Sequence, residues 1–193
     1  MKNKNIKWMF VLGALLALMV AGCDDGDADV DFGYALIFMP QAREDIYVVP
    51  GGGGPYTYNF VIDWVDLLTP DKIHVFLSVT RTGKLINNEG FSVDIVPSTE
   101  KTAAAIASGE ITNPLAMPAT VYTMPERVTV EPGKNSASFF LTINAIDLMR
   151  SAYTNRNLTL AIELRNPSNY ELNELMSTTI LTIDVDEMRG IMY

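Results

Sequence analysis

Residues 56–64 read YTYNFVIDW, and large apolar side chains alternate there with smaller or polar ones. Successive side chains of a β-strand point to opposite faces, so this alternation predicts a strand with one apolar face. The apolar face has five members, Tyr56, Tyr58, Phe60, Ile62 and Trp64. The stretch therefore indicates a sheet that buries one side against a protein core.

The same period of two recurs along most of the chain. It is found in the segments 34–40, 45–50, 72–80, 91–96, 127–143, 158–173 and 178–186. Within 127–143, Pro132 and Gly133 fit the two central positions of a type II turn, because proline fixes φ at the first and glycine accepts a positive φ at the second. Eight or nine strands predict an all-β domain, and we expect a β-sandwich rather than a barrel.

One short helix is predicted between these strands, in residues 98–110, STEKTAAAIASGE. Ser98 is the expected N-cap, Glu100 suits the positive end of the helix, and Gly109 is the expected stop. The following residues, 111–120, contain too many prolines for regular structure, which we expect to resume at Val121.

The N-terminal residues have the pattern of an exported protein. Residues 1–7 carry three lysines and no acid, and residues 8–22 form an apolar run. This run is shorter than the roughly 20 residues that span a bilayer. A short transmembrane anchor is the alternative, but the length and the basic start favour a signal peptide at residues 1–22.

Cys23 directly follows this run, and it is the only cysteine of the chain. The sequence VAGC at residues 20–23 resembles the lipobox of bacterial lipoproteins, in which the cysteine sulfur is acylated and the cysteine becomes the mature N-terminus. The resemblance implies lipidation of Cys23; the alternative is an unmodified cysteine in an apolar segment. Two or three acyl chains would attach the protein stably to a membrane.

Residues 23–33 are predicted to form an acidic tether. They contain five aspartates, Asp24, Asp25, Asp27, Asp29 and Asp31. A calcium loop is the alternative, but the glycine and the terminal glutamate of an EF-hand are not in place. The run resembles the acidic export signal of Bacteroidetes lipoproteins, which implies an outer-membrane location facing the cell exterior. The expected order is signal peptide 1–22, tether 23–33, sandwich domain 34–186 and C-terminal tail 187–193.

Charge and cysteine usage exclude some functions. The chain has a net charge of −9, and loss of residues 1–22 leaves 11 basic against 23 acidic residues, or −12. Such a surface repels phosphate backbones, so we expect no nucleic-acid partner. A lone cysteine forms no intramolecular disulfide, so stability must come from a packed core, which 171 residues can form as one domain.

Three segments together resemble a known domain family. They are KIHVFLSVTRTG, MPATVYTMPERVTVEPGKNSASFFLTI and NLTLAIELRNPSNYELNELMSTTILTIDV, and their order resembles the domain of unknown function near the N-terminus of many Bacteroidetes surface lipoproteins. The family's motif positions correspond to Met117, Pro118, Tyr122, Val128, Val130 and Gly133, with methionine where leucine is more usual. The resemblance implies an immunoglobulin-like sandwich, a fold that in this family often precedes an endo-β-N-acetylglucosaminidase or a sugar-binding domain. The sequence ends soon after the last expected strand, so we expect the function to belong to this module or to a complex that it joins.

We expect no enzymatic activity, no metal site and no cofactor. His74 is the only histidine, and with no cysteine in the expected domain it is read as structural rather than as part of a Cys/His dyad, a Ser-His-Asp triad or a zinc site. Glycosidases need only two carboxylates, and four acids are available in Asp63, Asp66, Glu163 and Asp184. Among 23 acids such candidates arise by chance. The acids at 184–187 are an alternative calcium site, without visible partners.

Exposed aromatic rings are the expected means of binding glycans, since sugar rings stack their C–H faces on them. Trp64 is the first candidate, although its alternation with Phe60 and Ile62 favours a place in the core. Tyr153 and Tyr170, in loop-like contexts, are the others. We predict a surface lipoprotein that acts as a non-catalytic glycan-capture or accessory module of a polysaccharide-utilisation system. The alternative is a structural or adhesive protein that binds other surface proteins.

Overall fold

The structure is a computed structural model, and it describes residues 33–51, 59–85 and 89–193. Cys23, the tether up to residue 32, and Tyr56 and Tyr58 of the quoted stretch lie outside these residues, so the predictions made for them are not addressed by it.

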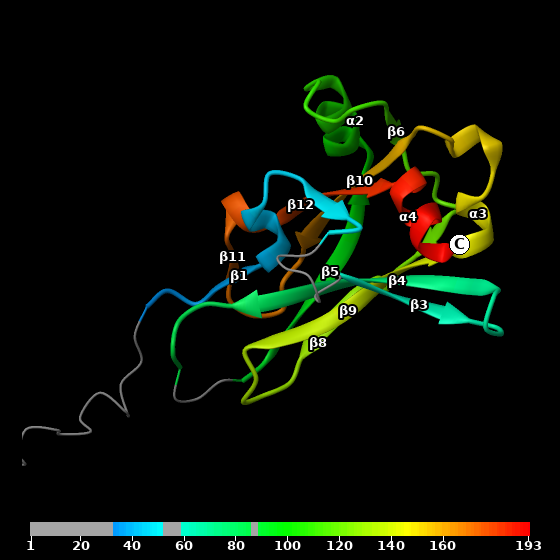
Figure 1. The fold of residues 1–193 in the computed structure, drawn as a ribbon. Coiled ribbons are helices and arrows are strands. Elements are labelled where there is room, and N and C mark those ends of the chain that lie inside the picture. Colours follow the sequence, from blue (N-terminus) through cyan, green and yellow to red (C-terminus); the bar gives the residue numbers. More distant parts are fainter. Residues whose placement is uncertain (1–32, 52–58, 86–88) are drawn as a thin grey trace, which may run out of the picture.

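Two curled sheets make up most of the described chain (Figure 1). The first has the strand order β11-β1-β4-β9-β7, with β3 also paired to β4. Its strands are β1 (Leu36–Phe38), β3 (Phe60–Trp64), β4 (Pro70–Arg81), β7 (Tyr122–Thr123), β9 (Ser136–Asn144) and β11 (Glu171–Leu172). All pairs in this sheet are antiparallel except that of β1 with β11.

The second sheet has the strand order β2-β12-β10-β5-β8, with β6 also paired to β10. Its strands are β2 (Tyr47–Val49), β5 (Phe91–Ser98), β6 (Pro114–Ala116), β8 (Arg127–Val130), β10 (Asn157–Arg165) and β12 (Thr178–Asp184). The pairs of β2 with β12 and of β6 with β10 are parallel. The pairing of β6 with β10 shows that the proline-rich residues 111–120 are only partly irregular, whereas β7 begins one residue after Val121, where regular structure was predicted to resume.

The apolar side chains of both sheets meet in one core. Alternate residues of β4 are buried, among them Val75 and Leu77. In β10, residues 158–164 are all buried, and Leu158 and Ile162 belong to the core. This arrangement is consistent with the predicted all-β sandwich. The immunoglobulin-like type stays a prediction.

The predicted helix is α2 (Thr99–Ala107), and its ends lie where the sequence placed them. The Ser98 side chain accepts a hydrogen bond from the Lys101 backbone N–H, and Gly109 follows with a φ of 79°. The buried Thr102 hydroxyl donates to the Ser98 carbonyl and accepts from the Ala161 N–H at 2.9 Å. The hydroxyl of Thr102 therefore attaches the helix to β10.

The expectation of a single helix and a C-terminal tail is wrong. The described residues form two more α-helices, α3 (Ala145–Leu148) and α4 (Val185–Met192), and three 3-10 turns, η2 (Pro40–Arg43), η3 (Ser151–Tyr153) and η4 (Glu174–Met176). Asp184 caps α4 by accepting from the Glu187 N–H, and Met188 and Met192 enter the core. The last residues therefore belong to the folded domain.

The predicted turn at Pro132 and Gly133 is confirmed. The Lys134 N–H donates to the Glu131 carbonyl at 3.0 Å, and Gly133 has a φ of 81°. Within the part of the chain that the structure describes, no helix has the length and apolar character needed to cross a membrane.

Candidate functional site

The three aromatic residues proposed from the sequence are not brought together. Trp64 ends β3 opposite Pro70 and is 43 % exposed, so the expectation that it joins the core is wrong. A shift of register between Asp63 and Trp64 interrupts the alternation that would have turned the indole inward. Tyr153 is buried in the core, so the expectation that it is free to contact a ligand is also wrong.

Tyr170 is half-buried and packs against the core at the other end of β4 from Trp64. The guanidinium of Arg81 lies 5.1 Å from the centre of its ring, and the ring of Phe91 meets it edge-on at 5.9 Å. Tyr170 therefore has a structural role in joining β4, β5 and β11.

A different pair of aromatic rings lies on the outer side of the first sheet. Val75 and Leu77 point into the core, which turns Phe76 outward, and Phe140 is turned outward in the same way between Phe139 and Leu141. The register places Phe76 directly opposite Phe140, with ring centres 5.2 Å apart. Phe76 is 36 % exposed and Phe140 is 43 % exposed.

Polar side chains lie beside these two rings on the same side of the sheet. His74 is hydrogen-bonded through Nδ1 to Thr142 Oγ1 at 2.9 Å and through Nε2 to Asp63 Oδ2 at 2.9 Å. Its ring also meets Phe140 edge-on at 5.6 Å. Val61, opposite His74 on β3, is exposed. We call the surface of Val61, Asp63, His74, Phe76, Phe140 and Thr142 the aromatic face.

A shallow hollow adjoins the aromatic face between β7 and β9. Its volume is about 420 Å³, and it is lined by Thr123, Met124, Pro125, Phe139, Phe140 and Thr142. The hollow and the two phenylalanines together offer an apolar floor with hydroxyl, imidazole and carboxylate groups at its edge. This surface therefore combines apolar area with a few hydrogen-bonded polar groups.

The row of Thr142, His74 and Asp63 has the residue types of a hydroxyl-histidine-carboxylate triad, so the sequence-based exclusion of such a triad was too strict. The chemistry of acyl transfer also needs backbone donors aimed at the developing oxyanion. Thr142 lies inside β9, paired with β4 on one side and with β7 on the other, where ladder hydrogen bonds engage the backbone. The row is therefore suited to present hydrogen-bonding groups to a ligand rather than to attack one.

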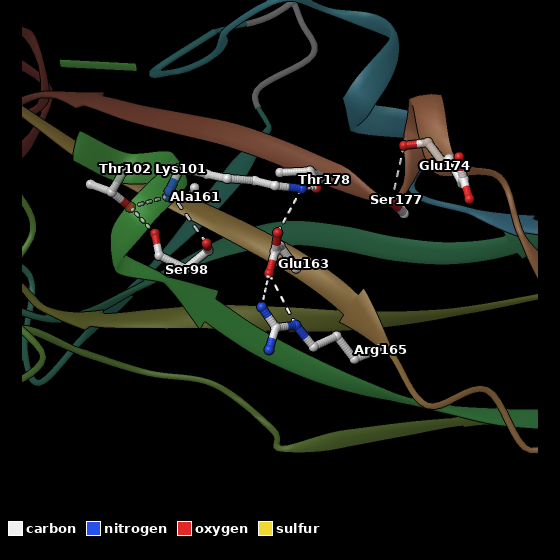
Figure 2. A network of polar contacts seen from close by, with 9 residues as sticks. All are labelled: Ser98, Lys101, Thr102, Ala161, Glu163, Arg165, Glu174, Ser177 and Thr178. Atoms are coloured by element: carbon white, nitrogen blue, oxygen red, sulfur yellow. Dashed lines mark hydrogen bonds and ion pairs between the residues drawn. The ribbon is translucent and has the colours of Figure 1, made fainter. Parts of the chain in front are cut away.

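Glu163 lies at the centre of an ion-paired cluster outside the aromatic face (Figure 2). This buried side chain on β10 binds Lys101 Nζ at 2.6 Å and Arg165 Nη2 at 2.5 Å, while Lys101 also donates to Thr178 Oγ1 at 2.7 Å. The hydrogen bond from Lys101, helped by Arg165, lowers the pKa of Glu163 despite its burial. A general acid needs a raised pKa, so Glu163 acts as a structural anion that holds α2 on the sheet.

The other acids considered for glycoside hydrolysis also have structural partners. Asp66 accepts hydrogen bonds from the Leu68 N–H and the Thr69 hydroxyl in the turn between β3 and β4. Asp184 caps α4. Among residues 33–51, 59–85 and 89–193, no three His, Cys, Asp or Glu side chains are grouped as metal ligands.

We expect Glu163→Gln to lower the free energy of unfolding by about 1–3 kcal/mol at pH 7, because two charge-assisted hydrogen bonds lose their anion. Since the folded pKa lies below the ordinary value of 4.5, this stabilisation is complete above pH 4.5 and is lost as the pH falls through the folded pKa. Urea unfolding of both proteins between pH 3 and pH 7 measures the difference.

Glu174→Gln is the matched control, since Glu174 contributes its main-chain carbonyl to the same network. It should leave stability almost unchanged at every pH. A loss for Glu163→Gln that stayed constant down to pH 3 would contradict the assignment of an ionised Glu163.

Comparison with known proteins identifies no relative of established function. No protein-family model matches the chain. No curated protein matches it either. Solved structures of Bacteroides proteins do resemble it at low identity. A putative carbohydrate binding protein from Bacteroides ovatus is 8 % identical with a TM-score of 0.49, and the match covers 77 % of this chain and 36 % of that one.

Two further matches are multidomain proteins. A protein from Bacteroides ovatus that includes DUF1735 is 10 % identical with a TM-score of 0.45, over 72 % of this chain and 38 % of that one. A two-domain protein of unknown function from Bacteroides fragilis is 13 % identical with a TM-score of 0.45, over 78 % of this chain and 45 % of that one. The chain thus spans less than half of the length of each of these three proteins.

Proposed function

We propose that this protein is a lipid-anchored surface protein of the bacterial outer membrane that captures glycans without cleaving them, as an accessory module of a polysaccharide-utilisation system. The observation that carries the binding role is the pair of exposed rings, Phe76 and Phe140, beside the hydrogen-bonded row of Asp63, His74 and Thr142. The anchor rests on the lipobox-like sequence that ends at Cys23 and on the acidic residues after it.

The chemistry of the aromatic face suits a sugar. The faces of aromatic rings carry partial negative charge, and the C–H groups of a pyranose ring carry partial positive charge, so the two attract each other. Sugar hydroxyls at the edge of the ring both donate and accept hydrogen bonds. Asp63 accepts and the Thr142 hydroxyl does both, so the polar row matches what the edge of a sugar offers.

The direct test is binding of the mature domain, residues 33–193, to a broad glycan array. We expect binding to one class of glycan, and the double variant Phe76→Ala with Phe140→Ala should weaken it at least about thirtyfold, because aromatic anchors commonly contribute 2 kcal/mol or more. Isothermal titration calorimetry with the bound glycan gives the affinities, and reaction products are monitored to confirm that the glycan stays intact.

Leu175→Ala, which removes an exposed apolar side chain outside the aromatic face, is the matched control and should bind normally. Circular dichroism checks that the double variant is folded. A wild-type domain that binds no glycan, or a double variant that binds as well as wild type, would overturn the proposed role of the aromatic face. Mass spectrometry tests the anchor separately, with an acylated Cys23 as the expected mature N-terminus.

A further inference from the structure

The turn between β3 and β4 exposes an unusual number of large apolar side chains. In five consecutive residues, Trp64 is 43 % exposed, Val65 71 %, Leu67 96 % and Leu68 81 %. Turns are usually formed by Gly, Pro, Asn, Asp and Ser, which lose little by facing water. Burying a leucine or valine side chain would contribute about 1.5–3 kcal/mol of favourable free energy, which an exposed side chain does not provide. We call residues 64–68 the hairpin tip.

The hairpin tip is held in place by hydrogen bonds. The Val65 N–H donates to the Thr69 carbonyl at 2.9 Å, which closes the turn. The Asp66 carboxylate accepts from the Leu68 N–H at 2.8 Å and from the Thr69 hydroxyl at 3.1 Å. The exposed side chains therefore project from a fixed backbone, which reduces the ordering that binding would require.

Acidic groups surround the apolar side chains. Asp66 lies between Val65 and Leu67, and Asp63 and Asp71 lie just before and just after the tip, with Lys72 as the one base in residues 63–72. Hydrogen bonding by the Leu68 N–H and the Thr69 hydroxyl lowers the pKa of Asp66, which is therefore ionised at neutral pH.

This charge decides between the possible partners. A carboxylate at the centre of the tip opposes entry into the hydrocarbon of a membrane, and the flanking acids are repelled by anionic lipids. Two tips facing each other would bring like charges together. An apolar pocket with Lys or Arg at its rim complements both the leucines and the acids. We propose that the hairpin tip inserts into such a pocket on a partner protein.

The position of the tip leaves it accessible. The described chain begins at Gly33, and a Cβ added there would lie 3.4 Å from Gly83 Cα. Gly83 follows Arg81, the last residue of β4. The hairpin tip lies at the opposite end of β4, just before its first residue, Pro70, and Figure 1 shows the β3–β4 hairpin on the other side of the domain from the start of β1. Twelve residues of strand span roughly 36 Å, so the tip points away from the side where the N-terminal segment joins the domain.

The two phenylalanines of the aromatic face lie away from the hairpin tip, although Asp63 at the edge of that face directly precedes Trp64. Phe76 lies six positions beyond Pro70 along β4, or roughly 20 Å. A glycan stacked on Phe76 and Phe140 and a protein on the tip can therefore be bound together. The inference does not depend on glycan binding, and each can fail without the other.

The experiment is photo-crosslinking of the full chain in its native cells, with a benzoyl-phenylalanine in place of Leu67. We expect an adduct with one protein, absent when the same group replaces the exposed Leu175, and lost when Leu68→Asp is added. The crosslinked peptide of the partner should lie among apolar residues close to Lys or Arg. The Phe76→Ala and Phe140→Ala variant should keep the adduct, which separates this test from that of the proposed function.

Affinity for the purified partner supplies the second readout. Asp66→Asn keeps an oxygen that can accept from the Leu68 N–H and removes the charge, so binding should weaken by about three- to tenfold at low salt and by less at 0.5 M salt, where exposed charges are screened. Adducts only with lipid, only with a second copy of this chain, equally at position 175, or with nothing, would each overturn the proposal, as would an unaltered affinity of Asp66→Asn.

Discussion

Met188→Ala is expected to lower the free energy of unfolding by about 2–5 kcal/mol, because it leaves a cavity where a fully buried side chain closes the core. Met188 lies in α4, which Arg189 ties to the end of α3 and the residues before η3 through the carbonyls of Leu148 and Arg150. These bonds hold the helix in place, so it cannot easily collapse into the cavity. Urea unfolding followed by circular dichroism gives the difference.

The matched control for this variant is Ile191→Ala, in the same helix but on its exposed side. It should change stability by less than about 1 kcal/mol. Equal losses for the two variants would mean that α4 is not part of the core, and would restore the expectation of a C-terminal tail.

Gly90→Ala is expected to lower the free energy of unfolding by about 3–5 kcal/mol, the sum of an unfavourable backbone conformation and a steric clash. Gly90 has a φ of 77°, and a Cβ there would lie 2.5 Å from the Val130 carbonyl oxygen and 2.8 Å from the Pro132 nitrogen. Both are backbone atoms, so the clash is relieved only by moving the turn between β8 and β9. Thermal and urea unfolding measure the loss.

Gly133→Ala separates the two causes. Gly133 has a similar φ of 81°, but a Cβ there would meet nothing within 4 Å. This variant should lose only about 1–2 kcal/mol, the conformational part alone. If both alanines had the same effect, the close packing of Gly90 against the turn would be contradicted.

Local signals in the sequence predicted several elements correctly. Ser98 and Gly109 mark the ends of α2 because capping depends on one side chain or one backbone angle. Pro132 and Gly133 mark their turn for the same reason. The long strands β4 and β9 follow from the period of two that one-sided burial imposes. In β10 the residue types keep this period, although both faces of the strand are buried.

Predictions failed where tertiary contacts decide. Gly190 and the short length of α4 hid its helical pattern, although an acidic cap at Asp184 and two methionines four positions apart were visible. Tyr153 sits in a loop-like sequence, but η3 turns it into the core. Trp64 departs from its alternation because of an irregularity that no residue type announces.

The aromatic face was missed even though one signal for it was present. Phe139 and Phe140 are adjacent in a strand, so they must point to opposite faces, and only one of them can enter the core. The pairing of Phe140 with Phe76, residues more than sixty positions apart, depends on the register of β4 and β9. Register of this kind is set by the whole sheet and is not readable from either strand alone.

The strands β1 and β2 each form a parallel pair with a strand near the end of the chain. Leu36 of β1 lies opposite Glu171, although β1 also pairs with β4. Val49 of β2 lies opposite Ile183, so this pair joins residues more than 130 positions apart. Joining segments so distant in sequence is slow. During synthesis, neither sheet is completed until nearly the entire polypeptide has emerged, because β11 and β12 both lie near its end.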